Sequence, residues 1–524
     1  MTERYYITTP IYYVNDKPHI GHAYTTLACD AIARFMRLDG KEVFFLTGTD
    51  EHGQKVAKAA QDAGLDPQTF TDQVSQNFRD LAAAMNFSHD QFIRTTEERH
   101  TKASQAIWQA MAKAGDIYLG KYAGWYAVRD EAFYGEDELT KGPDGKFTAP
   151  SGAPVEWVEE PSYFFKLSAW QDRLLKFYEE CEKKGTPFIL PQSRRNEVVS
   201  FVKSGLRDLS VSRTSFKWGV PVPGDPKHIM YVWVDALTNY ITAIGYPDTN
   251  AATFKKFWPA DLHMVGKDIL RFHAVYWPAF LMSAGIAPPR RVFAHGWWTN
   301  EGQKISKSLG NIIDPLQLIA TYGLDQTRYF LLREVPFGND GDFSHKSMVG
   351  RINAELANGI GNLAQRTLSF INKNCGGTLP VPGPFSAADK AMLDAARALL
   401  PAMRASVGVQ ELHKALGDWV DVVVRANQYI DAEAPWTLRK TDPKRMETVL
   451  YVLAETLRHL GVLLRPFAPG SAGTLLDQLA VAPSSRAFAS LGEGGALKGG
   501  TALPAPKGIF PRYVEDSEPK AGRA

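Results

Sequence analysis

The beginning of the chain alternates between strand-like and helix-like patterns, and this alternation restricts the possible folds more than any other feature. Residues 4–9 are β-prone and lead into a turn rich in Pro, Asn and Asp. Residues 27–36 repeat apolar side chains at helical spacing, and Gly40 stands where a helix commonly ends. A short apolar run at 43–46 and a second helical pattern from Lys55 follow. The order strand, helix, strand, helix predicts an α/β fold with a parallel sheet.

The composition and periodicity of the sequence change twice in the rest of the chain. Residues 116–225 contain short Tyr- and Trp-rich segments and Gly/Pro-rich turns, which predict an insertion of short strands. The α/β pattern resumes with the apolar runs 230–234 and 262–265, which we expect to be strands that are each followed by a helix. From residue 348 the sequence is rich in Ala, Leu and Arg, and its helical periodicity predicts a helix bundle. The periodic segments are 348–373, 388–407, 409–432 and 444–466.

The composition indicates a globular protein of several domains. Of the 524 residues, 44% are hydrophobic and 22% are charged, so the chain has enough apolar material for buried cores. It contains neither an apolar run of the ~18 residues that cross a bilayer nor a signal-peptide pattern, so we expect a cytoplasmic protein with no membrane contact. The three cysteines are scattered, which excludes a disulfide framework and a four-thiolate metal site.

The net charge of +2 argues against a protein that coats nucleic acid through charge alone. The charge is nevertheless unevenly distributed. Residues 1–345 have 38 basic and 41 acidic side chains, a net charge of −3, whereas residues 346–524 have 21 and 16, a net charge of +5. The basic end is compatible with an anionic partner, and equally with a solvated helical domain.

Two polar motifs that lie far apart in the sequence have the composition of a phosphate site. His19-Ile-Gly-His22 opens a predicted helix, whose N-terminal N–H groups attract phosphate, and its two imidazoles can donate hydrogen bonds to phosphate oxygens. Lys304-Ile-Ser-Lys-Ser308 offers two ammonium groups and two hydroxyls. Taken singly, the first motif could be a metal pair or two surface histidines, and the second a solvated loop. The two motifs together in this order are a much more specific signal of a phosphate site than either motif alone.

With these motifs and several longer stretches, the chain resembles the methionyl-tRNA synthetases, a family of class I aminoacyl-tRNA synthetases. The resemblance covers nearly the whole chain. It is more specific than the class motifs, because Trp233, Tyr240 and His273 together are typical of the methionine-specific members. The matching stretches are Pro10–Asn15, His19–His22, Phe45–Gly53, Tyr231–Ala236 with Tyr240, Gly266–Ile269 with Phe272 and His273, Lys304–Ser308, Asn362–Arg366 and Ala434–Trp436.

The resemblance implies a Rossmann-like catalytic domain with a parallel sheet, split by a connective insertion and followed by an all-α helix-bundle domain that binds the anticodon. The expected regions are 1–115 for the first half of the catalytic domain, 116–225 for the insertion, 226–299 for the second half, 300–347 for the loop of the Lys304–Ser308 motif and a stem-contact region, and 348–524 for the anticodon-binding bundle with a C-terminal tail.

The resemblance also implies the residues of three binding sites. Methionine would be bound by Ile11, Tyr12, Asp50, Trp233, Ala236, Leu237, Tyr240, Ile269 and His273. ATP would be bound by His19, Gly21, His22, Gly266, Asp268, His295, Gly296, Trp297, Lys304, Ser306 and Lys307. The catalytic groups would be His19, His22, Lys304 and Lys307, and the anticodon would be read by Asn362, Arg366 and Trp436.

The chemistry of these residue types agrees with the implied roles. Aromatic walls offer a thioether S···π contacts of roughly 0.3–1.5 kcal/mol, and Asp50 offers a charge partner to the α-ammonium group. Trp, Asn and Arg suit stacking and hydrogen bonding to unstacked bases. Without the resemblance, the aromatic residues would be read as ordinary core, Asp268 as a helix cap and Trp436 as a cap of the bundle core.

The implied reaction begins with in-line attack of the methionine carboxylate on the α-phosphorus of ATP. Methionine then passes from methionyl-adenylate to the terminal ribose of initiator and elongator methionine tRNA. The protein would supply positioning and charge stabilisation rather than a nucleophile, and Mg²⁺ would arrive with the triphosphate. Because the chain ends at Ala524 without the dimerising domain of longer relatives, we expect a monomer.

The insertion departs from the family pattern. Many relatives have four cysteine ligands for zinc there, whereas the corresponding residues here are Ala127, Asp130, Thr148 and Ser151. One carboxylate cannot hold a structural ion, so we expect no zinc. The insertion would then be held by aromatic packing, around Trp125, Tyr126, Phe133 and Trp157. Its ~110 residues leave no obvious room for an editing domain, so we expect no separate editing site. The resemblance implies that homocysteine is the competitor of methionine, because it differs by only one methyl group.

Two other functions stay open. A tRNA-binding paralogue that has lost catalysis should have damaged phosphate motifs or a damaged Asp50, and all of these are intact. An amino-acid adenylate ligase that works without tRNA should lack the anticodon residues, and these are present. Methionine-dependent exchange and tRNA charging distinguish the three functions.

Overall fold

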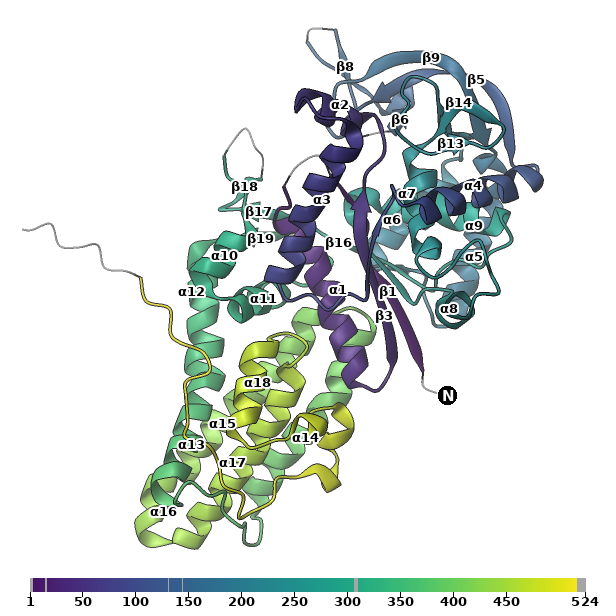
Figure 1. Cartoon of the computed structure of the whole chain (residues 1–524). Coiled ribbons are helices and arrows are strands. Elements are labelled where there is room, and N and C mark those ends of the chain that lie inside the picture. The colour runs from purple at the N-terminus through teal and green to yellow at the C-terminus, as the bar shows by residue number, and fades with distance from the viewer. Residues whose placement is uncertain (1–2, 15–16, 131, 144, 306–309, 516–524) are drawn as a thin grey trace, which may run out of the picture. The chain divides into compact units, whose positions relative to one another are not determined.

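The computed structural model describes residues 3–14, 17–130, 132–143, 145–305 and 310–515 (Figure 1). The chain divides into two compact units. One, here called the sheet unit, consists of residues 4–18 and 43–295. The other, the helical unit, consists of residues 1–3, 19–42 and 296–524. The first long helix of the chain, α1, therefore belongs with the C-terminal helices rather than with the strands that flank it in the sequence.

The sheet unit is built on a seven-stranded sheet in the order β10-β16-β15-β1-β3-β2, with β4 also paired to β3. The pairings β1 with β15, β15 with β16, β10 with β16, β2 with β3 and β3 with β4 are parallel, which confirms the predicted α/β class. Strand β10 comes from the middle of the expected insertion. The strands are β1 (Arg4–Thr8), β2 (Tyr12–Tyr13), β3 (Glu42–Asp50), β4 (Gln91–Arg94), β10 (Ile189–Leu190), β15 (Leu262–Gly266) and β16 (Val292–His295).

One expected strand of this unit is wrong. The run 230–234 is not a strand of the parallel sheet: β14 (Asp225–Met230) ends where the run begins, and residues 232–234 belong to helix α7 (Val232–Thr242). All eleven residues of α7 are buried, so the run lacks the polar face that distinguishes a helix from a buried strand. The other helices of the unit are α2 (Gln54–Asp62), α3 (Pro67–Ala84), α4 (Glu98–Lys113), α5 (Gln171–Lys183), α6 (Gln192–Lys203), α8 (Ala252–Phe257) and α9 (Trp277–Ser283).

The predicted insertion of short strands is confirmed in part. Its first and last portions form antiparallel sheets, whereas α5 and α6, which lie between them, were not predicted. The larger sheet has the order β11-β9-β5-β6, and the smaller one has the order β12-β14-β13. Strand β5 pairs with β9 along most of its length, from Ile117 opposite Phe165 to Tyr126 opposite Glu156. The strands are β5 (Ile117–Ala127), β6 (Ala132–Tyr134), β9 (Glu156–Phe165), β11 (Leu209–Ser210), β12 (Ser212–Arg213) and β13 (Pro221–Val222).

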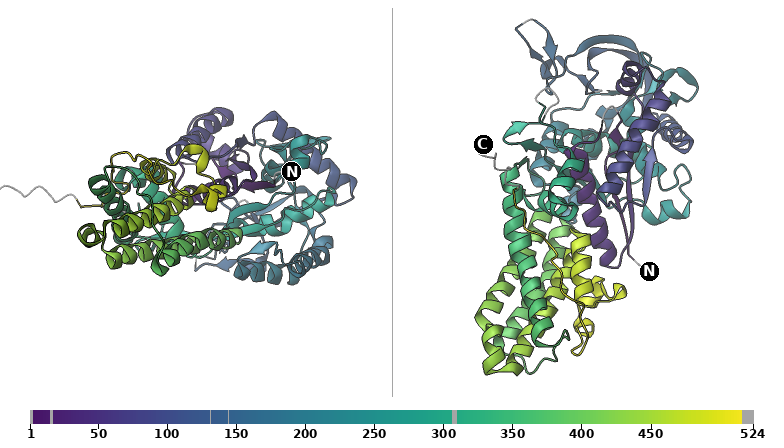
Figure 2. Two further views of the ribbon diagram at one scale, coloured as in Figure 1. Left: turned by 90° about the horizontal axis from the view of Figure 1, so that it is seen from below. Right: turned by 60° about the vertical axis from the view of Figure 1, so that its left-hand side comes forward.

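The C-terminal helix bundle is also confirmed, and its long helices run alongside one another in green to yellow (Figures 1 and 2). The predicted segment 348–373 is helical throughout, but residues Ile352–Gly361 are π-helical, which the periodicity did not reveal. Four helices, α10, α11, α16 and α18, were not predicted. The helices are α10 (Pro315–Tyr322), α11 (Leu324–Arg333), α12 (His345–Arg351), α13 (Asn362–Asn374), α14 (Ala387–Gly408), α15 (Leu412–Glu433), α16 (Pro435–Thr441), α17 (Pro443–Leu464) and α18 (Pro469–Gln478).

Helix α1 (Ile20–Leu38) is held in the helical unit by buried charge. Nη2 of Arg328 on α11 lies 2.7 Å from Oδ2 of Asp30, and both side chains are fully buried. Nε of the same arginine donates to the carbonyl oxygen of Phe467 at 3.0 Å. Gly40 has φ of +83°, a conformation that glycine adopts without strain, which confirms the predicted end of this helix. The ion pair fixes α1 to α11, and the hydrogen bond ties α11 to the segment between α17 and α18.

Candidate functional site

The predicted ligand residues of the sheet unit gather at the carboxyl ends of its strands. Strands β3, β15 and β16 end at Asp50, Gly266 and His295, and the segment that leaves β1 leads to Ile11. Gly266 and His295 are direct neighbours in the parallel register. This is the edge at which open α/β sheets bind ligands.

Tyr240 and His273 form the polar end of the predicted methionine group. The hydroxyl of Tyr240 lies 2.7 Å from Nε2 of His273, whose Nδ1 lies 2.9 Å from the carbonyl oxygen of Ile269. Because a carbonyl only accepts, Nδ1 carries the proton and the hydroxyl of Tyr240 donates to Nε2. Burial lowers the pKa of His273 to about 4, so the ring is neutral near pH 7.

A second histidine supports Tyr240 from the sheet. The ring of His263 on β15 stacks on the Tyr240 ring with centroids 4.2 Å apart. Nε2 of His263 accepts from Trp277 at 3.3 Å, so its Nδ1 is left to donate to the hydroxyl of Thr8 at 2.8 Å. Burial holds the pKa of His263 well below its usual range. Tyr240 therefore lies between two neutral imidazoles.

The apolar members of the methionine group come from one face of α7. Trp233, Ala236, Leu237 and Tyr240 are spaced at i, i+3, i+4 and i+7, which places them on one side of the helix. The indole of Trp233 stacks on Phe272 with centroids 3.8 Å apart and planes 7° apart. Its Nε1 is buried without a hydrogen-bond partner among the described residues. Packing and not hydrogen bonding thus sets the position of this indole.

Ile11 and Tyr12 do not pack together. Ile11 lies against the apolar cluster that contains Trp233 and Tyr240. The Tyr12 ring stacks on Phe78 of α3 instead, with centroids 5.7 Å apart, in a separate cluster with Val14 and Val56. The structure therefore brings Ile11 to the other methionine residues, while it packs the Tyr12 ring against α3.

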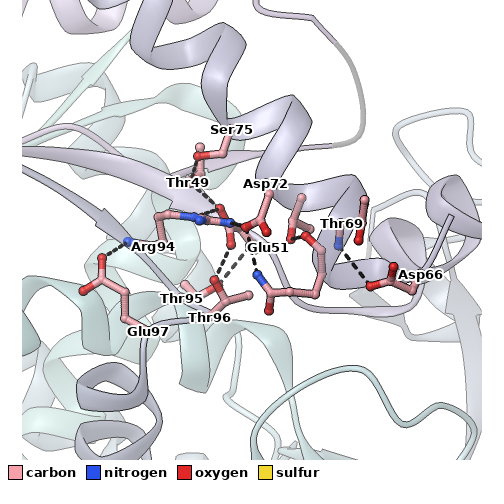
Figure 3. A network of polar contacts seen from close by, with 12 residues as sticks. Thr49, Glu51, Asp66, Thr69, Asp72, Ser75, Arg94, Thr95, Thr96 and Glu97 are labelled. Carbon is pink, nitrogen blue, oxygen red and sulfur yellow. Dashed lines mark hydrogen bonds and ion pairs between the residues drawn. The ribbon is translucent and has the colours of Figure 1, made fainter.

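Asp50 is 3% exposed, and the residue that follows it is held by a polar network (Figure 3). The fully buried carboxylate of Glu51 accepts from the hydroxyl of Thr49 at 2.8 Å, from Nε of Arg94 at 2.7 Å and from the hydroxyl of Thr96 at 2.5 Å. The backbone N–H of Glu51 donates to the hydroxyl of Thr95 at 2.9 Å. These hydrogen bonds compensate the charge of the Glu51 carboxylate and fix the direction of the backbone next to Asp50.

A second buried network contains two histidines and an aspartate that the sequence analysis missed. Oδ2 of Asp235 on α7 lies 2.7 Å from Nδ1 of His52, and its Oδ1 lies 2.6 Å from Nε2 of His100 on α4. The two imidazoles hold the pKa of Asp235 well below its usual range, against the opposing effect of burial. His52 and Asp235 lie in stretches that match the family, but nothing in the sequence links them to His100, which is 135 residues from Asp235 in the chain.

In the helical unit, the two histidines of the first motif lie side by side at the start of α1, with ring centroids 3.9 Å apart. Nδ1 of His19 accepts from the backbone N–H of Gly21 at 3.1 Å, and Nδ1 of His22 accepts from the backbone N–H of His19 at 3.1 Å. A neutral ring that accepts at Nδ1 carries its proton on Nε2. Burial and the neighbouring ring of His19 lower the pKa of His22 well below its usual range.

Gly21 is required by this arrangement. A Cβ atom at that position would lie 2.9 Å from Cε1 of His19, closer than side-chain carbons approach one another. The absence of a side chain lets the ring of His19 fold over the first turn of the helix. The motif thus presents two Nε2–H donors beside a helix N-terminus, which is the arrangement that binds anions.

The second motif is described only in part. Lys304 is exposed on β18 (Gln303–Lys304), which pairs with β17 (Trp298–Asn300). Trp297 is 49% exposed, and its backbone N–H donates to Asp340 at 2.9 Å. Gly296 packs against the chain at residues 339–340, where a Cβ atom would lie 2.3 Å from the carbonyl oxygen of Asn339. Ser306 and Lys307, both predicted ATP ligands, lie outside the described residues.

The predicted anticodon residues lie on neighbouring helices of the bundle. The guanidinium carbon of Arg366 on α13 lies 5.2 Å from the centroid of the Trp436 ring on α16. Its Nη2 is 2.6 Å from Oδ1 of Asp431, a residue that the sequence analysis did not select. Trp436 is 42% exposed, and Asn362 at the start of α13 is exposed as well. The indole therefore does not cap the bundle core.

The residues of the insertion at which zinc ligands were considered make ordinary protein contacts. The carboxylate of Asp130 accepts from the hydroxyl of Ser151 and from the hydroxyl of Tyr134, the latter at 3.0 Å. Ala127 is fully buried beside Ala149 and Ala153. Within the described ranges, no group of three or more His, Cys, Asp or Glu side chains could hold a metal ion.

The described part of the chain contains no helix that is both long and apolar enough to cross a membrane. Residues 5–368 match the family model described as tRNA synthetases class I (M). Residues 379–521 match the model described as the anticodon binding domain of methionyl tRNA ligase.

Similar proteins cover this chain almost completely. The methionine–tRNA ligase of Brucella suis biovar 1 (strain 1330) is 60% identical over 98% of this chain and 99% of its own length. The methionine–tRNA ligase of Mesorhizobium japonicum is also 60% identical, over 98% of both chains. Among solved structures, the Mycobacterium tuberculosis methionyl-tRNA synthetase in complex with methionyl-adenylate has a TM-score of 0.95 at 53% identity, over 98% of this chain and 100% of that one.

Proposed function

Because this chain belongs to the methionyl-tRNA synthetases of class I, we propose that it activates methionine with ATP and transfers the methionine to methionine tRNA. The first step forms methionyl-adenylate and releases pyrophosphate. The second step forms the ester with the terminal ribose of the tRNA and releases AMP. Both initiator and elongator methionine tRNA are substrates, and the reaction serves translation in the cytoplasm.

The observation that carries this proposal is the uncharged polar end of the methionine group. Neutral His273 accepts from Tyr240, and neutral His263 stacks beneath the same tyrosine. A thioether is polarizable and carries no charge, so it fits beside neutral rings better than a charged side chain would. The apolar face of α7 supplies the remaining wall, with Trp233, Ala236 and Leu237.

The other binding roles follow from the chemistry of each residue. Asp50 pairs with the α-ammonium group of methionine, for which a buried carboxylate is the matching charge. Gly266 and His295 lie at adjacent strand ends, and Asp268 lies in the short helix that follows β15. Together they bind the nucleoside of ATP. Gly296 and Trp297 lie near the adenine. Ile11 and Ile269 complete the methionine site.

Catalysis consists of positioning and charge stabilisation. The Nε2–H groups of His19 and His22, beside the N-terminus of α1, donate to the phosphate oxygens that gain charge in the transition state. Lys304 and Lys307 neutralise the leaving pyrophosphate, and Ser306 donates from its hydroxyl. Mg²⁺ enters as part of the substrate, bound to the triphosphate.

Anticodon reading is assigned to the exposed group on the bundle. Trp436 offers a face for stacking, and Arg366 and Asn362 offer hydrogen bonds to base edges. Asp431 holds the guanidinium of Arg366 and so limits the directions from which a base can approach. We further propose that the protein is a monomer, which its elution mass tests.

We propose that the insertion binds no zinc. The single carboxylate at the former ligand positions, that of Asp130, is already engaged by Ser151 and Tyr134. Metal analysis of chelator-treated protein should find far less than one zinc per chain. A stoichiometric amount would overturn this proposal without affecting the proposed reaction.

Two assays test the function as a whole. Methionine-dependent exchange of pyrophosphate into ATP reports adenylate formation, and charging of methionine tRNA reports transfer. An inactive paralogue would fail the first assay, and a ligase that works without tRNA would pass the first and fail the second. The Lys307→Ala variant should lose exchange and keep its affinity for tRNA, because it removes a charge from the phosphate site alone.

A further inference from the structure

The cluster of His52, Asp235 and His100 has no part in the reaction as proposed, although its three side chains are buried and charged or polar. Asp235 is 1% exposed and His100 is fully buried. An ionised carboxylate at this depth is costly unless its oxygens accept hydrogen bonds. Each oxygen of Asp235 does so, from a different imidazole, at 2.7 Å and 2.6 Å.

Asp235 belongs to a second stripe of α7, distinct from the methionine face. Asp235, Thr238, Asn239 and Thr242 follow at i, i+3, i+4 and i+7, and all four are buried. Thr238, Asn239 and Thr242 donate to backbone carbonyl oxygens of α7 itself, at 2.6 to 3.0 Å. Asp235 alone in this stripe reaches partners on two other elements.

These partners determine both the rotation and the position of α7. His100 approaches from α4, while His52 approaches from the loop that follows β3. A rotation of α7 about its axis would break at least one of the two short hydrogen bonds. The same rotation would displace the opposite face of the helix, which carries Trp233, Ala236 and Tyr240.

The loop that carries His52 is itself fixed on both sides. The carbonyl oxygen of Glu51 accepts from Nε1 of Trp218 at 2.6 Å, and the backbone N–H of Gly53 donates to the carbonyl oxygen of Trp218 at 3.1 Å. The carboxylate of Glu51 is held by Arg94, as Figure 3 shows. His52 therefore joins α7 to a rigid loop whose neighbouring residue, Asp50, is the proposed partner of the ammonium group.

We infer that Asp235 is a positioning residue for methionine binding: through His52 and His100 it sets the distance between Asp50 and the methionine face of α7. The role inferred for the three side chains is to position other residues and not to bind methionine themselves. Together they hold the two halves of its binding site, one on the loop after β3 and one on α7, at a fixed separation. This inference rests on the proposed function, since the ligand of that site is methionine.

The test uses pairs of variants that keep or remove one donor. Asn places its Nδ2 near the position of Nδ1 of histidine, and Gln places its Nε2 near the position of Nε2. His52→Asn and His100→Gln therefore keep a donor toward Asp235, whereas His52→Leu and His100→Leu remove it. Asp389→Asn is the control, because Asp389 is a buried carboxylate of the helical unit that binds Arg445 at 2.7 Å and Tyr429 at 2.5 Å.

The readouts are the KM for methionine in the exchange reaction and the dissociation constant of methionine measured by calorimetry on the full chain. We expect both leucine variants to raise the two constants about tenfold or more, because a displacement of about 1 Å is costly in a preorganised site. The KM for ATP and the rate at saturating methionine should change much less. The two donor-keeping variants should stay near the wild-type values, as should Asp389→Asn, even where the melting temperature falls.

The outcomes separate the inference from the proposed function. Equal methionine constants in the wild type and in both leucine variants would overturn the inference, with the melting temperature showing that the proteins are folded. A loss that is equal within each pair would also overturn it, because retention of the donor would then have no effect. If the wild type itself neither binds methionine nor supports exchange, the proposed function fails instead.

Discussion

The methionine group of the sheet unit and the anticodon group of the helical unit are built in opposite ways. Tyr240 and His273 are each 1% exposed, and their polar atoms are bonded to one another and to the backbone. Trp436 is 42% exposed, with Arg366 beside its ring. A site that encloses a small ligand requires preorganised polar groups, whereas a site for an unstacked base requires an exposed flat surface.

The same contrast appears in how the polar side chains are fixed. In the sheet unit, His263, Asp235 and Glu51 are each held through partners far away in the sequence. On the bundle, Arg366 is held by one exposed carboxylate, that of Asp431, and such a pair contributes little to stability in water. Substitutions in the sheet unit should therefore strongly weaken methionine binding, whereas substitutions on the bundle should affect only the step that uses tRNA. The following predictions test this difference.

The largest effect is expected for Asp50→Asn. This change leaves the ammonium group of methionine without its charge partner in a buried site, which costs about 3–5 kcal/mol and thus more than about a hundredfold in kcat/KM for exchange. Affinity for tRNA should not change. Exchange kinetics and a tRNA-binding titration check the two halves of this prediction. An affinity for methionine close to that of the wild type would contradict the assignment of Asp50.

A smaller effect, confined to the tRNA step, is expected for Trp436→Ala. Loss of one base stack costs about 1–3 kcal/mol, or roughly 5- to 150-fold in kcat/KM for charging. Methionine-dependent exchange should stay unchanged, because the residue lies on the helix bundle. Trp436→Phe retains an aromatic face and should recover most of the charging. Equal losses of exchange and charging in the alanine variant would contradict the anticodon role.

Tyr240→Phe should weaken methionine binding about tenfold. The hydroxyl is the donor to Nε2 of His273, and its removal leaves a buried acceptor without a partner, which costs about 1–3 kcal/mol. Calorimetric titration with methionine measures the effect. Tyr429→Phe, which removes a hydroxyl from Asp389 in the bundle, is the matched control and should leave methionine affinity intact.

The smallest effect concerns pH. Because burial lowers the pKa of His273 to about 4, the ring is neutral throughout the range in which an ordinary histidine titrates. The dissociation constant of methionine should change less than about twofold between about pH 8 and about pH 5.5. It should rise only as the pH approaches 4, where the protonated ring can no longer accept from Tyr240. A steady weakening that starts near the usual histidine pKa would show that the site is open to water.

Several elements of the fold could be read from periodicity. The helices near 388–407, 409–432 and 444–466 have polar and apolar faces, and each was predicted within a few residues of α14, α15 and α17. The run 230–234 could not be assigned, because a helix that is buried on all sides has no alternating pattern. Trp233 was therefore selected for the methionine group, but it was placed on the wrong type of element.

The candidate site, like the fold, has parts that could be predicted from the sequence and parts that could not. His19-Ile-Gly-His22 determines its own local geometry, since each Nδ1 accepts from a backbone N–H within three residues of it. The residues of the methionine group, by contrast, were predicted from the resemblance to the family, because aromatic residues at this spacing would otherwise indicate ordinary core. Nothing in the sequence signals that His263 stacks on Tyr240 or that His100 binds Asp235, because those contacts join segments that only the folded sheet brings together.

The sequence by itself determined the α/β and helix-bundle classes and the two phosphate motifs, because each of these depends on spacing along a few turns or on residue chemistry. The ligand residues were predicted from the resemblance to the family. Only the tertiary structure decided which side chains hold those residues in place, and which charges are buried. The physical reason is that burial and long-range hydrogen bonds fix protonation and orientation, and both arise between segments that are distant in the chain.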